Sequence, residues 1–354
     1  MTGYFKQSVL NLLGYTSPPQ KEFRVKLNQN ESPFDVPHEI KDELAEAAKT
    51  LEWNRYPVNE SPALLQKLAE RHEVEPNHIL LGNGSNQLFQ TLLTATLKPG
   101  DRVVSTPPTF SLYDLYSTIY DAKQIDILHA PGTDYPYTSV LAAIQEHNPK
   151  LVFVCSPNNP TGYEVDLDLV AELCKACDGL VFFDEAYGEF SLQTAMPLLE
   201  EYDNLIISRT FSKAFSMAGL RFGYFIARPD IIAQLRKVNI PYNVNIFTEL
   251  VALRLLDEQE NMHEHVSFLI QERRRLYHEL EEIPGVTVFR SAANFLLFRG
   301  LEHLNLFQAL KERGVLVRDV SSYPLLEGYS RVSVGYREEN DLFLDTLKSI
   351  MNSL

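Results

Sequence analysis

Residues 179–215, GLVFFDEAYGEFSLQTAMPLLEEYDNLIISRTFSKAF, contain two short apolar runs that each end in polar side chains. The runs at 180–183 and 205–207 are apolar at consecutive positions, which is typical of strands covered on both faces. Similar runs occur at 78–82, 101–105, 150–155 and 223–227, and helical patterns at 38–51, 86–97 and 166–177 lie between them. This alternation predicts an α/β fold with a mainly parallel central sheet flanked by helices.

The composition narrows the class of protein. The chain has 354 residues with 47 acidic and 32 basic side chains, a formal charge of −15. This charge argues against a nucleic-acid partner and against a membrane partner. Cysteines stand only at 155, 174 and 177, so a disulfide framework is not expected. The start of the chain does not resemble a signal peptide, and a cytoplasmic location is expected.

Three parts are expected along the chain. Residues 36–245 carry the strand–helix alternation and predict a large ligand-binding domain. Residues 246–354 begin with a long helical stretch and continue with short strands, which predicts a smaller α+β domain. Residues 1–35 are expected to form an N-terminal arm that packs with the small domain.

Polar segments follow two of the predicted strands, at the sheet edge where ligands bind in parallel sheets. Gly82–Asn86 precedes an apolar helix and leaves backbone N–H groups that attract phosphate. The same residues also suit an ordinary turn in which Ser85 or Asn86 caps the helix. SPNNPTG (156–162) offers amide donors and acceptors on a loop fixed by prolines, and a plain turn explains it equally well.

Two charged residues follow the strands quoted first. Asp184 ends a buried strand and therefore needs a partner, such as a cationic ring nitrogen, a helix start or a salt bridge. Lys213 lies beside hydroxyl residues, and Arg221 follows eight residues later. Nearby positive charge favours the neutral amine that Schiff-base chemistry requires. Thr210, Ser212 and Arg221 could hold a phosphate, whereas the alternative for Lys213 is an ordinary exposed lysine.

Three strings in this order carry a family resemblance: SPNNPTG (156–162), DEAY (184–187) and SRTFSKAFSMAGLRFGY (208–224). Together they resemble the class I and II aminotransferases, which are pyridoxal 5′-phosphate (PLP) enzymes of fold type I. The resemblance covers nearly the whole chain. It implies a PLP-dependent transamination in two half-reactions, between a small-molecule amino donor and a keto acid.

The resemblance also implies roles for single residues at the reacting centre. Lys213 matches the lysine that binds the cofactor covalently and moves a proton between substrate and cofactor. Asp184 matches the partner of the pyridinium nitrogen, which lets the ring accept electrons. Tyr187 and Asn159 match the residues that hydrogen-bond the ring hydroxyl. Phe110 matches an aromatic residue that stacks on the cofactor ring.

Further matches concern the cofactor phosphate and the neighbouring subunit. The implied phosphate site consists of small, polar and basic residues: Gly84, Ser85, Asn86, Thr210, Ser212 and Arg221. Tyr56, in NRYP (54–57), matches a tyrosine that reaches the cofactor of the neighbouring subunit. This match implies a homodimer with shared active sites.

A closer resemblance, to the histidinol-phosphate aminotransferases of histidine biosynthesis, rests on KLNQNESPF (26–34), GVLVRDVSSYPLLEG (314–328) and RVSVGYREEND (331–341). It implies that histidinol phosphate and 2-oxoglutarate give imidazole-acetol phosphate and glutamate. Arg331 matches the arginine that binds the anionic group of the substrate. Arg318 is either a second anion contact or a strand-end salt bridge. Tyr15 and Asn30 complete the substrate-side residues.

Three other functions are compatible with parts of this pattern. An aromatic amino-acid aminotransferase is the nearest alternative, followed by a phosphothreonine decarboxylase. A PLP-sensing regulator without turnover is a non-enzymatic alternative. It is disfavoured because the chain leaves no room for a DNA-binding extension and has no basic face. No metal site is expected.

Overall fold

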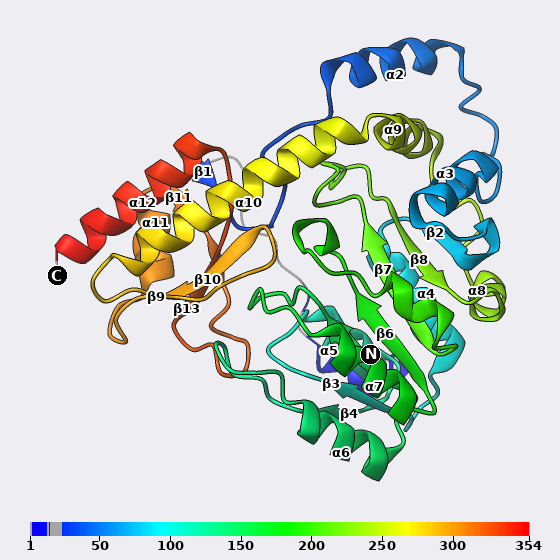
Figure 1. Ribbon diagram of the computed structural model, residues 1–354, viewed down its shortest axis with the longest axis horizontal. Coiled ribbons are helices and arrows are strands. Elements are labelled where there is room, and N and C mark those ends of the chain that lie inside the picture. The colour runs from blue at the N-terminus through cyan, green and yellow to red at the C-terminus, as the bar shows by residue number, and fades with distance from the viewer. Residues whose placement is uncertain (1, 13, 15–22, 354) are drawn as a thin grey trace.

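The computed structural model describes residues 2–12, 14 and 23–353. Its largest element is a seven-stranded sheet at the right of Figure 1. In spatial order the strands are β2 (Ile79–Gly82), β8 (Gly223–Ala227), β7 (Leu205–Thr210), β6 (Leu180–Asp184), β5 (Leu151–Cys155), β3 (Arg102–Ser105) and β4 (Lys123–Asp126). Only β8 runs antiparallel to its two neighbours, so the predicted mainly parallel sheet is confirmed.

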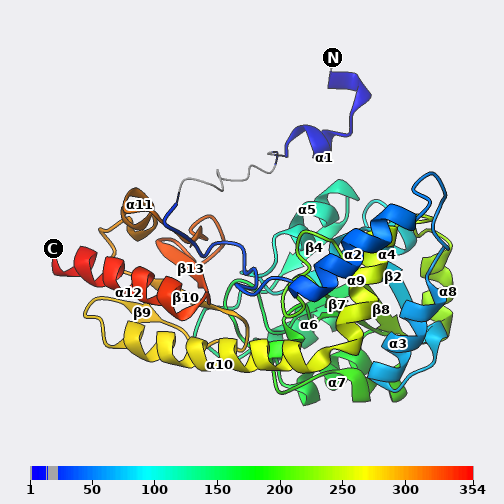
Figure 2. The same cartoon turned by 90° about the horizontal axis from the view of Figure 1, so that it is seen from above.

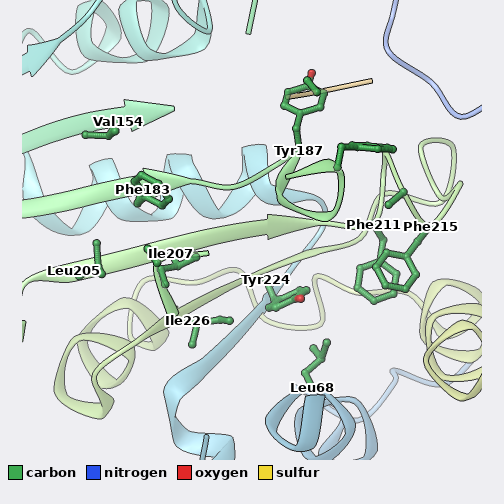
Figure 3. Packing of buried hydrophobic residues seen from close by; sticks show 14 of the residues in the cluster. Leu68, Val154, Phe183, Tyr187, Leu205, Ile207, Phe211, Phe215, Tyr224 and Ile226 are labelled. Atoms are coloured by element: carbon green, nitrogen blue, oxygen red, sulfur yellow. The ribbon is translucent and has the colours of Figure 1, made fainter. Parts of the chain in front are cut away.

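Successive strand residues point into two different cores. Phe182 and Ile206 pack with α4 (Ser85–Thr96), α5 (Leu112–Ile119) and α8 (Pro229–Arg236) on one face of the sheet. Phe183 and Ile207 pack on the other face with α3 (Pro62–His72), α6 (Tyr137–His147) and α7 (Leu167–Ala176), and Figure 3 shows part of this core. Because neighbouring strand residues alternate between faces, burial of both faces requires the consecutive apolar residues of these strands.

A second, four-stranded antiparallel sheet lies apart from the first, at the left of Figure 1. Its order is β12 (Arg318–Asp319), β13 (Tyr329–Ser333), β10 (Phe295–Arg299) and β9 (Thr287–Val288). The helices α11 (Leu306–Glu312) and α12 (Arg337–Asn352) pack beside it in a core of their own. We call the part built on the seven-stranded sheet the large lobe and this part the small lobe.

Two consecutive helices lead from one lobe to the other. α9 (Ile246–Asp257) contacts α2 (His38–Thr50) and α3 of the large lobe. α10 (Gln259–Glu281) runs along both lobes (Figure 2). Its residue Leu269 belongs to the large-lobe core, and Leu276 and Leu280 belong to the small-lobe core. The chain therefore passes between the lobes within α10, later than the expected boundary at residue 245.

The described part of the N-terminal arm contacts both lobes. β1 (Val25–Lys26) pairs in parallel with β11 (Val315–Leu316) of the small lobe. Before the undescribed stretch, η1 (Thr2–Tyr4) and α1 (Gln7–Leu10) lie elsewhere, and α1 contacts α5 of the large lobe. Lys6 donates to the carbonyl oxygen of Ile119 at 3.1 Å. Within the described part of the arm, β1 thus lies with the small lobe and α1 with the large lobe, whereas packing with the small lobe was expected for residues 1–35 as a whole.

The remaining elements are short 3₁₀ helices: η2 (Pro76–His78), η3 (Gly188–Phe190) and η4 (Met196–Glu200). Across the described residues, none of the helices is both long and apolar enough to cross a membrane.

Candidate active site

A cavity of about 390 Å³ lies at the carboxyl ends of β5, β6 and β7, and residues of the small sheet form one of its walls. Most of the residues singled out from the sequence line it: Asn30, Ser85, Asn86, Phe110, Asn159, Asp184, Tyr187, Thr210, Ser212, Lys213, Arg221, Arg318 and Arg331. These residues come from both lobes and from the segment that follows β1. The fold therefore brings together side chains that are far apart in the sequence.

Two predicted residues that the structure describes do not line this cavity. Gly84 immediately precedes α4 and lies next to the guanidinium of Arg221. Tyr56 is 82 % exposed and stacks on Tyr242, with ring centroids 4.7 Å apart. Tyr15 lies outside the described residues.

One end of the cavity is formed by hydroxyl groups, a guanidinium and the start of α4. The Arg221 Nη1 donates to Ser212 Oγ at 3.2 Å, and Thr210 Oγ1 donates to the same oxygen at 3.1 Å. Ser85 is the first residue of α4, where unpaired N–H groups and the helix dipole favour an anion. These residues carry donors and no acidic side chain, so this end of the cavity suits a phosphate.

The backbone at this end is held in conformations that most residues avoid. Gly84 has φ +74°, and a Cβ there would come within 2.7 Å of Arg221 Nη2. Arg221 itself has φ +58°, in the left-handed region that non-glycine residues rarely occupy. Such strain concentrates at functional sites. Here it places the guanidinium directly in front of the α4 start.

The adjacent carboxylates Asp184 and Glu185 point to different surroundings. Glu185 forms a buried ion pair with Arg209 on the side away from the cavity. Asp184 lines the cavity and accepts hydrogen bonds from neutral donors, the Tyr113 hydroxyl at 2.7 Å and the Ala186 N–H at 3.0 Å. Burial raises the pKa of Asp184 to about 6, and both hydrogen bonds act against this rise. A cationic group in the cavity would provide the charge partner that a buried carboxylate needs.

Lys213 lies where its amine is easily deprotonated. Its Nζ donates to the backbone oxygen of Gln29 at 3.0 Å and lies 5.8 Å from the centroid of the Tyr187 ring. Burial and the nearby charges of Arg331 and Arg221 lower the pKa of Lys213 to about 7. A substantial fraction of this amine is therefore neutral and nucleophilic near pH 7.

Asn30 connects the arm to the centre of the site. Its amide nitrogen donates to the Tyr187 hydroxyl at 2.8 Å, and its backbone oxygen accepts from Asn294 at 3.1 Å. Its φ of +53° is again left-handed. Burial raises the pKa of Tyr187 to about 12, so its hydroxyl stays protonated at neutral pH.

The two asparagines of SPNNPTG have separate surroundings. Asn158 is bonded within its own loop and to the neighbouring one, where it accepts from Thr109 Oγ1 at 2.7 Å and donates to the Pro108 oxygen at 2.9 Å. Asn159 lines the cavity and accepts from Arg331 of the small lobe. Arg331 also donates to the backbone oxygen of Asn28 at 2.9 Å. The loop is therefore more than a plain turn, because Asn159 joins it to the other lobe.

Two arginines face each other on the small sheet. Arg318 on β12 is the register partner of Arg331 on β13, and both line the cavity. Like charges at directly opposite positions destabilise a sheet. Arg318 forms no ion pair within the described residues, so the strand-end salt bridge considered for it is not seen. The wall formed by these residues can bind an anionic group of a ligand.

Comparison with known proteins agrees with this geometry. The family model "Aminotransferase class I and II" matches residues 24–347. The chain belongs to this family. It is 37 % identical over 329 residues to a histidinol-phosphate aminotransferase of Thermoanaerobacter sp. (strain X514), with 93 % of each chain covered. A protein of the same name from Chlorobaculum tepidum is 37 % identical over 331 residues, covering 93 % of this chain and 95 % of that one.

The fold of the aminotransferase is also that of solved structures. The crystal structure of histidinol-phosphate aminotransferase from Sinorhizobium meliloti in complex with pyridoxal-5′-phosphate superposes with a TM-score of 0.88 at 22 % identity, covering 100 % of this chain and 99 % of that one. The predicted fold type I architecture is confirmed. The predictions of a PLP-dependent aminotransferase and of PLP as its cofactor are likewise confirmed.

The cavity of this aminotransferase fits the chemistry of the cofactor. PLP carries a phosphate, a ring nitrogen that can be cationic, and an aldehyde. The cavity offers a donor-rich end at Arg221 and the α4 start, a buried carboxylate at Asp184 and an amine at Lys213. Each reactive feature of the cofactor thus has a complementary group in the cavity.

Several residues of the site were not found from the sequence. Tyr113 bonds Asp184 from α5, and its place three residues after Phe110 was the available clue. Asn28 and Gln29 contribute backbone oxygens, which no sequence motif reports. Cys155 and Tyr323 also line the cavity. Burial raises the pKa of the Cys155 thiol to about 12, so this cysteine stays protonated.

Proposed function

We propose that this aminotransferase transfers the amino group of histidinol phosphate to 2-oxoglutarate, forming imidazole-acetol phosphate and glutamate in histidine biosynthesis. The observation that carries the proposal is the pair of facing arginines, Arg318 and Arg331, in the cavity that also contains Lys213. A substrate phosphate between them would offset their mutual repulsion. The relatives at 37 % identity carry the name of the same activity.

The chain's own residues then have the following parts. When bound, PLP supplies an electron sink for the bond broken at the substrate Cα. The Lys213 amine, whose pKa of about 7 leaves much of it uncharged at pH 7, would accept the proton from that carbon and donate it back on the side of the cofactor. The Asp184 carboxylate would keep the ring nitrogen in its cationic form, and Phe110 would stack on the ring.

The remaining residues orient cofactor and substrate. Ser85, Asn86, Thr210, Ser212 and Arg221 hold the cofactor phosphate, with Gly84 leaving room for the guanidinium. The Tyr187 hydroxyl and Asn159 bind the ring hydroxyl. Asn30 holds Tyr187 in place through its 2.8 Å hydrogen bond and borders the substrate. Tyr15 is proposed as a further substrate-side hydroxyl.

We further propose a cytoplasmic homodimer with shared active sites. The exposed Tyr56 is the residue proposed to reach the partner's cofactor, and the neighbouring Trp53 and Val58 are also exposed. These apolar side chains favour a covered surface. The three cysteines are free and buried, which suits a reducing compartment. The division into large domain, small domain and arm is part of this proposal, with α9 counted with the large domain.

A comparison of amino donors tests the substrate. The holoenzyme is incubated separately with histidinol phosphate, phenylalanine and phosphothreonine in the presence of 2-oxoglutarate, and glutamate and carbon dioxide are measured. We expect the highest kcat/KM for histidinol phosphate. An equal or higher value for phenylalanine would identify an aromatic aminotransferase instead, and carbon dioxide release from phosphothreonine would identify a decarboxylase.

A further inference from the structure

A second hollow lies on the surface along α10, outside the cavity described above. It consists of two adjoining depressions of about 320 and 340 Å³, which share Arg273, Arg274, Arg290 and Ser291. The large lobe contributes Gly162–Glu164 to its lining, and the small lobe contributes residues 290–292. The hollow therefore spans the junction between the lobes. Figure 2 shows α10 passing along this junction.

Positive charge gathers in this hollow although the chain as a whole carries −15. Within the described residues, none of the three arginines forms an ion pair. Arg273 is half-buried and donates to the backbone oxygen of Ala293 at 2.7 Å, while Arg274 and Arg290 are exposed. Burial, and then the charge of Arg274, lower the pKa of Arg273 to about 10. The guanidiniums thus repel one another, and the charge of Glu164 offsets this repulsion only in part at Arg273.

Glu164 is the acidic residue of the lining, and its carboxylate is already engaged. It accepts from the Ser191 hydroxyl and from the Gln193 amide at 3.5 Å. Three guanidiniums stand against this one carboxylate, so the hollow remains positive overall. Apolar side chains, among them Ile270, Tyr277 and Leu296, lie beside the charges.

We propose that this hollow is a binding site for a small organic anion, a phosphate ester or carboxylate with an apolar or aromatic body. Its anionic group would lie among Arg273, Arg274 and Arg290, and its body against Tyr277 and Ile270. The guanidinium fork suits both phosphate and carboxylate oxygens. This site is separate from the cavity of Lys213, and the proposal does not depend on which amino donor the enzyme uses.

The position of the site connects its occupancy to the two lobes. The Ala292 N–H donates to the Gly162 oxygen at 2.8 Å, so the two segments of the lining are already bonded to each other. Gly162 follows the loop of Asn159, and Ala292 comes two residues before Asn294, which bonds Asn30. A ligand that contacts both segments would therefore stabilise the docking of the small lobe onto the site loop.

Binding of phenyl phosphate and benzoate to the PLP-loaded holoenzyme tests the proposal, with calorimetry giving affinity and equivalents bound. The arginines to be replaced are both exposed, which favours a folded Arg274→Gln/Arg290→Gln double variant, and thermal melting checks this. Arg313→Gln, an exposed arginine of the small lobe far from the hollow in sequence, is the matched control. Benzyl alcohol serves as the neutral ligand.

We expect the wild type and Arg313→Gln each to bind one equivalent of phenyl phosphate or benzoate in the hollow. The double variant should bind this equivalent roughly tenfold more weakly or not at all. Any equivalent bound at the active site persists in all three proteins, which separates the two sites. A preference for phenyl phosphate over benzoate identifies a phosphate ester as the ligand, and the reverse identifies a carboxylate. Equal equivalents and affinities in the wild type and the double variant, or equal binding of benzyl alcohol, would overturn the proposal.

Discussion

The floor of the active-site cavity and its small-lobe wall are assembled in different ways. On the floor, Asp184, Thr210, Ser212 and Lys213 come from the ends of two neighbouring strands and lie within 30 residues of one another in the sequence. In the wall, Arg331 contacts Asn159 and Asn28 and faces Arg318, so four separate segments meet there. The floor is made by one sheet, whereas the wall exists only when the lobes are docked.

This difference suggests separate roles for the two regions, catalysis at the floor and choice of amino donor at the wall. The floor groups fit the cofactor, which every donor must use. We propose that the wall groups bind the anion of one kind of donor, and the position of Arg331 depends on contacts between the lobes. Changes to the floor should therefore affect all donors equally, and changes to the wall should affect donors according to their charge.

Lys213→Ala is expected to have the largest effect. It removes both the nucleophile and the proton carrier, so transamination of every donor should fall by at least the ~10²–10⁴-fold that a positioned acid–base group supplies. Lys237→Ala, at an exposed position on the large lobe, is the matched control. Steady-state rates with histidinol phosphate and with phenylalanine measure the effect. A loss of rate with only one of the two donors would contradict the assignment of the floor to chemistry that all donors share.

The lowered pKa of Lys213 predicts an unusual pH dependence for covalent capture of PLP by the apo-protein. Only the neutral amine reacts, and its pKa of about 7 makes it available as pH rises through 7. A lysine of ordinary pKa would have roughly three orders of magnitude less neutral amine at pH 7. Borohydride trapping followed by mass spectrometry gives the rate at each pH. A midpoint above about pH 9 would contradict the lowered pKa, and Lys213→Ala is the blank.

Arg318→Gln tests the wall. Loss of one charge-assisted contact to a phosphate, worth about 1.5–3 kcal/mol, should lower kcat/KM for histidinol phosphate about 10–100-fold. Histidinol, which lacks the phosphate, should change by less than about threefold because no contact is lost. Steady-state assays with both donors measure the split, and Arg313→Gln is the control. An equal loss of kcat/KM for both donors would show that Arg318 supports the stability of the site and does not bind the anion.

Tyr113→Phe is expected to have the smallest effect. In the wild type, the 2.7 Å hydrogen bond from Tyr113 lowers the pKa of the Asp184 carboxyl. The variant lacks this bond, so the pKa of Asp184 should rise further. Asp184 then becomes protonated at a higher pH than in the wild type. When the solution is acidified, PLP binding to the variant should therefore begin to weaken at a higher pH, by up to about tenfold. Fluorescence titration with PLP measures this. Tyr116→Phe, on the same helix, should bind PLP like the wild type.

The sequence predicted the floor in detail because short motifs follow strands there. DEAY and SRTFSK stand directly after apolar runs, so their place at the carboxyl edge of the sheet follows from the strand pattern. It could not show that Asp184 and Glu185 have different surroundings, or that Tyr113 reaches Asp184 from α5. Those contacts depend on the helix packed over the strand ends.

The wall and the lobe boundary show what the sequence left open. Arg318 could have been a salt bridge or an anion contact, and its register opposite Arg331 decided what it faces. The boundary was expected at residue 245, but the chain passes between the lobes within α10 because α9 packs on the large lobe. The hollow among Arg273, Arg274 and Arg290 was likewise not predicted, because Arg273 and Arg274 resemble an ordinary charged helix face and Arg290 lies apart from them in the sequence.

By itself the sequence determined the fold class, the family and which motif residues follow the strands whose carboxyl ends border the cavity. Hydrophobic patterning fixes which faces of a strand are buried, and motif residues adjacent in the chain stay adjacent in space. Tertiary structure alone decided how Arg331 meets Asn159 and Asn28, how the two arginines face each other, and how the lobes enclose a positive hollow. The contacts of Arg331 with Asn159 and Asn28 join segments more than 100 residues apart, and packing of the two cores against α10 brings these segments within hydrogen-bond distance.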